Sequence, residues 1–289
     1  MNRAARSIAV DSERAEAVVA RLRSLHDGEK AFEDVLALGP AARAPLRRLL
    51  MEREPSGIWQ PRALAARALG AIRHANDILL DYLHHPRFPA DPVEFAGEEA
   101  VVNAAAEALA RNRYGPAFET LRMIVSVRPH LIGAVHALAA YGRVEAIPEL
   151  VTALGDDGSR HAAEAGLRRF GARARVPLVE RLEELSKAKD AAFNTNIRHR
   201  HAILGMLTEL GLPRDARSRV IMLMNDPDDR LAVAACGVAV VHGPPALRRR
   251  ALERLDDLAA HVDLRLRIEI DGILRRVGKR CRSEEGKQA

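Results

Sequence analysis

Apolar residues recur along this chain with the spacing of helices that bury one side. In the stretch 143–171, Arg160, Ala163, Leu167 and Gly171 stand at offsets 0, 3, 7 and 11. These offsets place the first three side chains along one side of a helix, and glycine is a common residue just past a helix end. The stretch therefore predicts a helix, a short acidic turn, a second helix and a closing glycine.

The same frame recurs through most of the chain. Its copies start at Gly28, Arg62, Val102, Leu131, Arg160, Arg200, Arg230 and Arg267. Successive starts are 29 to 40 residues apart, a period typical of repeated helix pairs. A proline six residues after the closing glycine marks the preceding first helix in three places, at Pro45, Pro148 and Pro177. We therefore expect about eight pairs of helices.

The turns between paired helices carry a further pattern. Asp156 precedes Arg160 in "GDDGSR", and Asp226 precedes Arg230 in "NDPDDR". Proline in the first helix, Asp in the turn and Arg opening the second helix together resemble the HEAT-repeat family, over roughly residues 12–279. The resemblance implies an all-α fold, an α-solenoid of stacked antiparallel helix pairs. The third and fourth copies depart from it, because Val102 and Leu131 replace the arginine.

The expected domain organisation follows from this repeat. One helix pair cannot bury its apolar side alone, whereas stacked pairs share a continuous core. Only 3% of the residues are aromatic against 48% hydrophobic, which suits close helix packing by Leu, Ala and Val. We expect an N-terminal extension at 1–11, a single domain at 12–279 and a flexible polar tail at 280–289.

Two insertions interrupt the period, at 83–99 and 185–199. Each falls between the first and second helix of a pair, so we expect both at the same rim of the solenoid. The first contains three prolines and is not expected to be helical through 86–92. Long loops of this kind often carry function, but simple divergence of an unconstrained surface loop is the favoured interpretation.

The two cysteines and the N-terminal residues bear on metal or disulfide chemistry and on the cellular location of the protein. Cys236 lies in an apolar run and is expected in the core, whereas Cys281 lies in the polar tail, so neither disulfide nor metal spacing is evident. The N-terminal residues include no apolar run of the signal-peptide type, which favours a cytoplasmic protein.

No active site is evident from the sequence. The pairs His84–His85 and His199–His201 lack the i, i+3 or i, i+4 spacing of helical metal ligands, so we expect no metal and no cofactor. Carboxylates fall mostly in charged runs, and nucleotide-binding or nucleophile motifs are missing. We predict no catalytic residues and lean away from an enzyme.

The arginines that open the second helices have two interpretations. They can bind anions at helix N-termini, or they can pair with turn aspartates and fix the stacking. The nearby aspartates favour the second interpretation. The expected structural ladder is Arg62, Asp156, Arg160, Arg200, Asp226, Arg230 and Arg267.

The sequence favours a non-enzymatic scaffold that binds a partner protein with an acidic surface on its concave second-helix face. The net charge of +6 is mild but positive. Outward positions of the second helices, with Arg198 and the rim aromatics, give the candidate contacts: Arg67, Arg111, His136, Arg168, Arg169, Arg198, Arg275, Arg276, Trp59 and Phe95. Glu107 and Glu209 interrupt this positive surface.

Two alternatives remain open at this point. Basic clusters at 167–175, 198–201, 247–250 and 274–280 allow binding of a nucleic-acid backbone, as in the HEAT-like alkylpurine DNA glycosylases. Base excision also needs aromatic residues against the damaged base and a carboxylate, and the aromatic residues here are few. A lower alternative is a bilin-lyase-like activity, because bilin lyases also resemble HEAT repeats.

Overall fold

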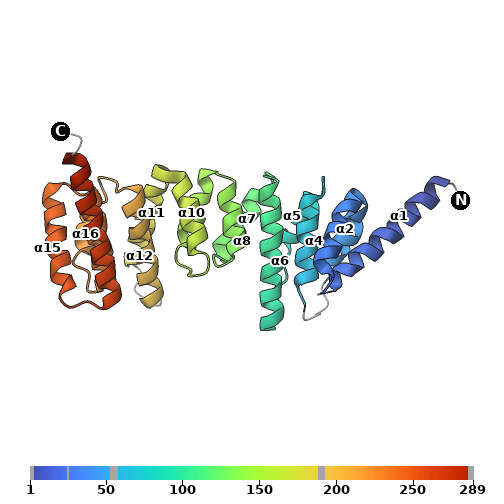
Figure 1. The fold of residues 1–289 in the computed structure, drawn as a ribbon, viewed down its shortest axis with the longest axis horizontal. Helices are drawn as coiled ribbons and strands as arrows, with labels where there is room; N and C mark the ends of the chain where they lie inside the picture. The colour runs from blue at the N-terminus through green and yellow to red at the C-terminus, as the bar shows by residue number, and fades with distance from the viewer. Residues whose placement is uncertain (1–2, 25, 53–57, 188–192, 286–289) are drawn as a thin grey trace. The chain divides into compact units, whose positions relative to one another are not determined.

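The computed structural model describes residues 3–24, 26–52, 58–187 and 193–285 (Figure 1). The surroundings of the side chains are described for these residues except 3–11, 193–194 and 276–285. Over the described ranges the protein consists of α-helices and short 3₁₀-helices, and these ranges include no β-strand. The predicted all-α fold class is therefore confirmed.

The chain divides into two compact units, Met1–Glu149 and Leu150–Ala289. The helices of the first unit are α1 (Arg3–Ala20), α2 (Gly28–Leu38), α3 (Arg43–Leu50), α4 (Gln60–Ala71), α5 (Asn76–His84), α6 (Pro92–Arg111), α7 (Ala117–Val127) and α8 (Ile132–Ala140). Short 3₁₀-helices lie at Arg21–Arg23, Gly39–Ala42 and Val144–Ala146. The predicted N-terminal extension is thus helical from Arg3 onward, as part of α1.

The second unit continues the same alternation of helices. After α9 (Ile147–Ala153), which spans the boundary, its helices are α10 (Arg160–Phe170), α11 (Arg175–Lys187), α12 (Phe193–Leu210), α13 (Arg217–Leu223), α14 (Asp229–His242), α15 (Pro245–Ala259) and α16 (Leu264–Glu285). A 3₁₀-helix at Gly171–Ala174 joins α10 to α11.

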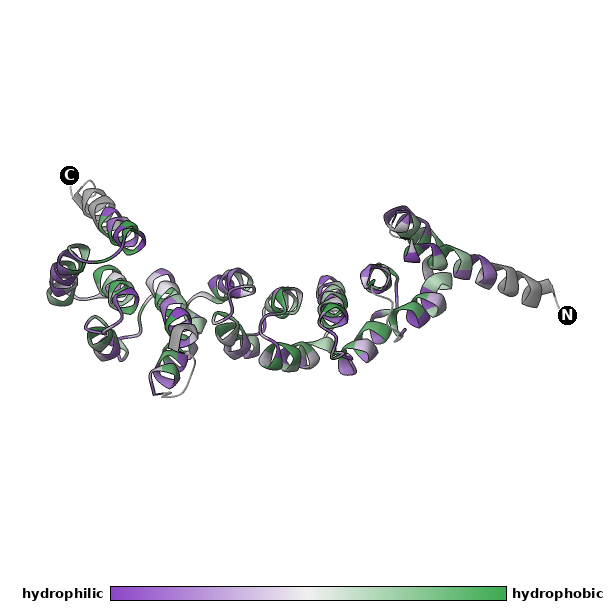
Figure 2. Ribbon diagram, turned by 90° about the horizontal axis from the view of Figure 1, so that it is seen from below, coloured by the Kyte–Doolittle hydropathy of each residue, from purple (hydrophilic) through white to green (hydrophobic). Residues whose placement is uncertain are grey.

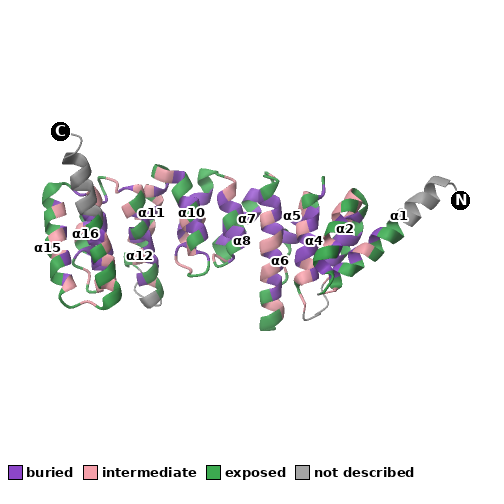
Figure 3. Cartoon of the chain, viewed as in Figure 1, coloured by how far each residue is buried: buried purple, intermediate pink, exposed green. Residues whose placement is uncertain are grey.

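The even-numbered helices are the second helices that the repeat predicts. Within the first unit α2 packs against α4, α4 against α6 and α6 against α8. Within the second unit α10, α12, α14 and α16 pack in the same consecutive manner. The predicted apolar positions, such as Ala65, Leu69, Ala163 and Leu167, are buried between these helices. Helices accordingly show apolar residues on some sides and polar residues on others, with the buried residues between neighbouring helices (Figures 2 and 3).

Closing glycines end several helices as predicted. Gly39, Gly142, Gly171 and Gly211 all have positive φ angles, between 57° and 109°, a backbone conformation that glycine adopts without a steric penalty. The last copy differs, because α16 continues through Gly278 to Glu285. Glycine inside a helix costs only about 1 kcal/mol relative to alanine, so Gly278 does not by itself stop the helix.

The two insertions mainly lengthen second helices, which corrects the expectation of rim loops. α6 begins at Pro92, ten residues before the predicted start at Val102, and α12 begins at Phe193. The physical reason in α6 is a strong start signal: the Asp91 side chain accepts hydrogen bonds from the backbone of Val93 and Glu94, and Pro92 takes the first helical position. Residues 86–91 are not helical, as their prolines predict, and 188–192 lie outside the described residues.

Candidate partner-binding site

A buried carboxylate organises one edge of the first unit. Glu98, on the early turns of α6, is only 4% exposed. Its Oε2 accepts a hydrogen bond from Arg62 Nη1 on α4 at 2.6 Å, and its Oε1 accepts one from Tyr82 Oη on α5 at 2.8 Å. The backbone N–H of Arg87 donates to the same Oε1 at 3.1 Å. Three donors thus bind one carboxylate. The cluster connects α4, α5, α6 and the segment between α5 and α6.

The same cluster fixes the guanidinium of Arg62. Its Nε donates to the Leu50 carbonyl at the end of α3, at 3.0 Å. Burial, together with the negative charge of Glu98, raises the pKa of Tyr82 far above its ordinary value, so the phenol stays protonated and donates. Because the carboxylate already accepts three hydrogen bonds, the cluster is suited to holding Arg62 in place rather than to transferring protons.

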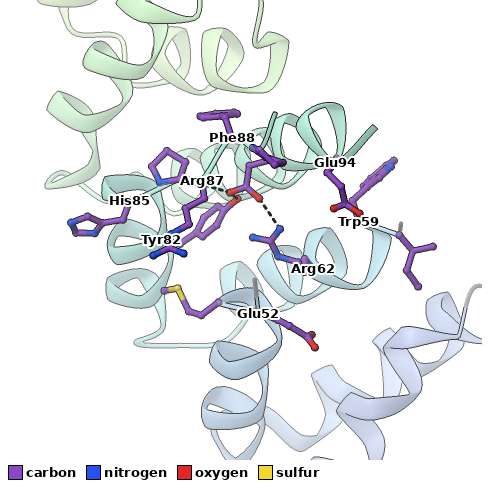
Figure 4. A pocket seen from close by; sticks show the side chains of 14 residues that line it. Glu52, Trp59, Arg62, Tyr82, His85, Arg87, Phe88 and Glu94 are labelled. Atoms are coloured by element: carbon purple, nitrogen blue, oxygen red, sulfur yellow. Dashed lines mark hydrogen bonds and ion pairs between the residues drawn. The ribbon is translucent and has the colours of Figure 1, made fainter. Parts of the chain in front are cut away.

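A pocket of about 510 Å³ opens over this cluster (Figure 4). We call it the Trp59 pocket. Its wall combines polar side chains with apolar ones: Glu52, Trp59, Arg62, Tyr82, His85, Arg87, Phe88, Glu94 and Glu98, with Met51, Ile58, Pro86, Pro89 and Gly97. Figure 4 shows Trp59 and Glu94 on one side of the pocket and His85 and Arg87 on the other.

A second hollow of about 520 Å³ lies on the second-helix face of the same unit. We call it the α4–α6 hollow. Small and apolar residues from these helices, among them Ala63, Leu64, Ala100 and Ala104, form much of its lining. Charged residues also line it: Glu29, Arg67 and Glu107. The lining is therefore of mixed apolar and charged character.

Trp59 lines both cavities. It directly precedes α4, where the backbone carbonyl of Trp59 accepts hydrogen bonds from Arg62 and Ala63. The ring packs on α6 where Gly97 leaves room, since a Cβ at Gly97 would lie 2.9 Å from the Trp59 Cβ. The side chain is nevertheless 39% exposed. This exposure fits the predicted role of Trp59 as a contact residue.

Phe95, the other aromatic candidate, serves the chain's own packing. It is half-buried, and its ring lies 5.3 Å from that of Phe88. The guanidinium of Arg128 lies over both rings, 3.5 Å from the centroid of Phe88 and 5.1 Å from that of Phe95. This cation–π cluster holds the 83–99 insertion against the segment that follows α7, so Phe95 is not an open anchor for a partner.

Four of the predicted contact arginines form ion pairs within their own units. Arg67 pairs with Glu29 at 3.2 Å and Arg111 with Glu107 at 3.7 Å. Arg168 binds Glu209 at 2.6 Å and Glu164 at 3.3 Å, and Arg198 binds Asp157 at 2.5 Å. Glu209 in turn raises the pKa of Arg168. The second-helix face is therefore less positive than the sequence predicts.

The remaining contact candidates have fewer partners. His136, Arg169 and Arg275 are exposed, and within the described part of the chain they form no ion pair. The side chain of Arg276 lies outside the described residues.

The arginines that open second helices follow several local patterns. Arg160 binds Asp157 at 2.5 Å, whereas Asp156 accepts hydrogen bonds from the backbone of Gly158 and Ser159. Arg200 reaches Asp226 of the following turn at 3.1 Å. The expected partnership of Asp156 with Arg160 is therefore replaced by one with the next aspartate, because Asp156 caps the turn instead.

The other members of the predicted ladder vary further. Arg230 binds Asp228 in its own turn at 2.7 Å and lowers the pKa of that carboxyl. Arg62 pairs with Glu98 instead of a turn aspartate, and Arg267 is exposed. Short turns offer several carboxylates within reach of one arginine, so spacing alone does not select the partner.

The remaining residues singled out from the sequence have local roles. Cys236 is fully buried as predicted, and burial raises the pKa of its thiol to about 12. Nε2 of His84 lies 2.9 Å from the hydroxyl of Thr120. Three or more metal-ligating side chains do not gather anywhere in the described ranges. Within those ranges, no helix has the length and apolar character needed to cross a bilayer.

Sequence reasoning does not single out Glu98 or Arg87, two central residues of this site. Glu98 stands in the run "EFAGEEAVV", where it resembles a solvated charge. A usable signal exists: Glu98 lies four residues before the buried Val102, on the same side of the helix.

Comparison with known proteins does not assign the chain to a family. No protein-family model matches the chain, and no curated protein matches its sequence.

Proposed function

We propose that this protein is a non-enzymatic HEAT-like scaffold that binds a partner protein on its second-helix face. Support for the architecture comes from the alternation of first and second helices and from the consecutive packing of second helices within each unit. In an α-solenoid such helices line an extended binding surface. The matching turn pattern of aspartate and arginine supports the HEAT-like assignment.

The α4–α6 hollow with Trp59 at its margin is the observation that carries the proposal. Tryptophan is strongly enriched among the residues that dominate protein–protein binding energy. Here it is exposed beside a hollow with small apolar residues, so a partner side chain can enter without displacing a large one. The charged residues around the hollow supply a polar rim.

The charges of this face favour a protein partner over a nucleic-acid backbone. A phosphate backbone is bound by several uncompensated cations, and binding strength depends on their number. Arg67, Arg111 and Arg168 are each paired with a glutamate, so few positive groups remain for phosphates. A protein partner requires only a few charge contacts around an apolar anchor.

A blocking substitution in the hollow tests this function. Ala104→Glu places a charged side chain among the lining residues, and Met123→Glu is a matched control on the exposed side of α7. We expect affinity capture from source-cell extract, quantified by mass spectrometry, to lose one specific protein with Ala104→Glu and to keep it with Met123→Glu. Equal capture by both variants contradicts the proposed surface.

A nucleic-acid binding measurement distinguishes the proposed protein partner from the alternative, a nucleic-acid backbone. Fluorescence anisotropy with a labelled duplex and a labelled single strand is measured at about 50 and 200 mM salt, the range over which phosphate contacts lose most of their strength. The scaffold proposal predicts no tight binding at either salt. Tight binding that weakens by orders of magnitude at the higher salt would replace a protein partner by a nucleic acid.

A further inference from the structure

We propose that the Trp59 pocket binds an acidic side chain of the partner protein, with an adjacent apolar side chain against Trp59. The inference rests on the proposed scaffold function and names the chemistry that its partner must carry. It starts from the cluster of Arg62, Glu98 and Tyr82. The proposed second-helix surface gives this cluster no role.

One arginine in the pocket has donors to spare. Arg62 uses Nε for the Leu50 carbonyl and Nη1 for Glu98, and its guanidinium also lies against Tyr82, 5.7 Å from the ring centroid. The guanidinium of Arg87 has no hydrogen-bond partner in the described part of the chain, although its backbone N–H binds Glu98. Arg87 therefore keeps its planar fork of N–H groups for a ligand, and such a fork binds a carboxylate through two parallel hydrogen bonds.

The carboxylates in the pocket decide where an anion can lie. Glu98 is neutralised by Arg62, and Glu52 pairs with Arg23 at 2.7 Å. Glu94 lies on the Trp59 side, opposite Arg87 (Figure 4). A ligand carboxylate therefore belongs at the end of the pocket with Arg87 and His85, where cationic and donor groups predominate.

The apolar residues define the rest of the ligand. Trp59 stands at the other end of the pocket and also lines the α4–α6 hollow, so a chain that crosses Trp59 reaches both cavities. An apolar side chain next to the acidic one packs on the indole and removes apolar surface from water. A free anion without an apolar neighbour contacts the Arg87 end of the pocket but leaves Trp59 uncovered.

Trp59 makes the experiment direct, because it is the only tryptophan in the sequence. The full chain is titrated with two N-acetylated, C-amidated tetrapeptides, Leu-Glu-Glu-Leu and Leu-Gln-Gln-Leu, while Trp59 emission is followed. We expect the acidic peptide to shift the emission saturably and to bind about tenfold or more tightly than the neutral one, the factor typical of hydrogen bonds to charged groups. Equal affinities, or no saturable change with either peptide, overturn the inference.

Matched arginine variants locate the carboxylate. Arg87→Gln removes an exposed guanidinium and leaves the backbone bond to Glu98, so the fold is expected to persist. We expect this variant to erase the preference for the acidic peptide, while Arg73→Gln, which replaces an exposed arginine in the turn after α4, keeps it. A preference that survives Arg87→Gln overturns the inference, whereas failure of the whole scaffold proposal is detected separately by the Ala104→Glu capture.

Discussion

Each of the two units contains an insertion that lengthens a second helix, and each of these helices buries a polar residue in a different setting. In the first unit, α6 carries Glu98, which is 4% exposed. In the second, α12 carries His199, which is 5% exposed. Glu98 lies at the base of an open pocket and is held by three donors from other segments. His199 is enclosed, and its Nε2 donates a hydrogen bond to the Val151 carbonyl at 2.8 Å.

This difference separates a site from a packing feature. The ring of His199 fits against Gly155, where a Cβ would lie 2.7 Å from Nδ1. Burial lowers the pKa of His199 to about 4, so the ring stays neutral and donates to the carbonyl. The cluster around Glu98 instead leaves arginine N–H groups facing a pocket. Burial of a polar residue alone therefore does not indicate function, and the proposed site rests instead on the unused donors beside the pocket.

The largest effect is expected from removal of the Glu98 carboxylate. Glu98→Ala leaves Arg62, Tyr82 and the Arg87 backbone without their acceptor, which costs about 3–5 kcal/mol for a broken buried ion pair. Denaturant unfolding followed by Trp59 emission reports this loss in the first unit. Glu33→Ala, on the exposed surface of α2, is the control and should change stability little. A loss below about 1 kcal/mol for Glu98→Ala would contradict the structural role.

The second effect is a pH dependence caused by His199. Its folded pKa of about 4 lies below the ordinary value of 6.5, so the unfolded chain takes up a proton first as the pH falls. The stability associated with neutral His199 is present above pH 6.5 and is lost between about 6.5 and 4, by about 3 kcal/mol in total.

Unfolding curves at several pH values test this dependence. Compared with wild type, His199→Gln should lose less stability between pH 7.5 and 4.5, because its side chain does not titrate. His136→Gln, which replaces an exposed histidine, should retain the wild-type slope. Identical slopes for wild type and His199→Gln would show that the ring is not buried as described.

A smaller effect is expected where Trp59 contacts α6. Gly97→Ala adds a methyl group 2.9 Å from the Trp59 Cβ, and overpacking of this kind costs about 1–3 kcal/mol. The wavelength of Trp59 emission should shift as the indole is displaced. Gly205→Ala in α12 is the matched control, since its Cβ meets nothing within 4 Å, and it should be neutral or stabilising. Unchanged emission in Gly97→Ala would contradict the packing of Trp59 on this glycine.

The smallest effect concerns the surface arginines of the second unit. Arg168 forms exposed pairs with Glu209 and Glu164, so Arg168→Gln should cost less than about 1 kcal/mol. The cost, measured by thermal unfolding at low salt, should shrink further at high salt because exposed pairs are screened. A large, salt-independent loss would mean that Arg168 is part of the core.

The sequence predicts the helices far better than it predicts the side-chain partners. The offsets 0, 3 and 7 locate the second helices, because apolar periodicity reflects burial directly. The start of α6 differs from the prediction, because Asp91 and Pro92 cap and open the helix where the prolines predict a loop. The role of Glu98 depends on Arg62 and Tyr82, 36 and 16 residues away, and a one-dimensional pattern does not carry such contacts.

Trp59 and Phe95 also show that the sequence pattern does not reveal side-chain contacts. Both are aromatic residues at or near the rim, yet one is exposed and lines two cavities and the other lies beneath Arg128. Likewise, the predicted contact arginines include several whose charge is compensated within the fold, because glutamates on neighbouring helices lie within reach. Whether an exposed position is available to a partner depends on these neighbours, which only the three-dimensional structure reveals.

Site-specific photo-crosslinking tests most directly the claim that the second-helix face of the first unit binds a protein. A photoreactive residue is placed at Ala104, in the α4–α6 hollow, or at Met123 on α7 as the control, and the protein is irradiated in source-cell extract. The account predicts one discrete crosslinked protein from position 104, lost on addition of unlabelled wild-type chain, and none from position 123. Crosslinking that is equal at both positions, or that yields no protein adduct at position 104, would contradict it.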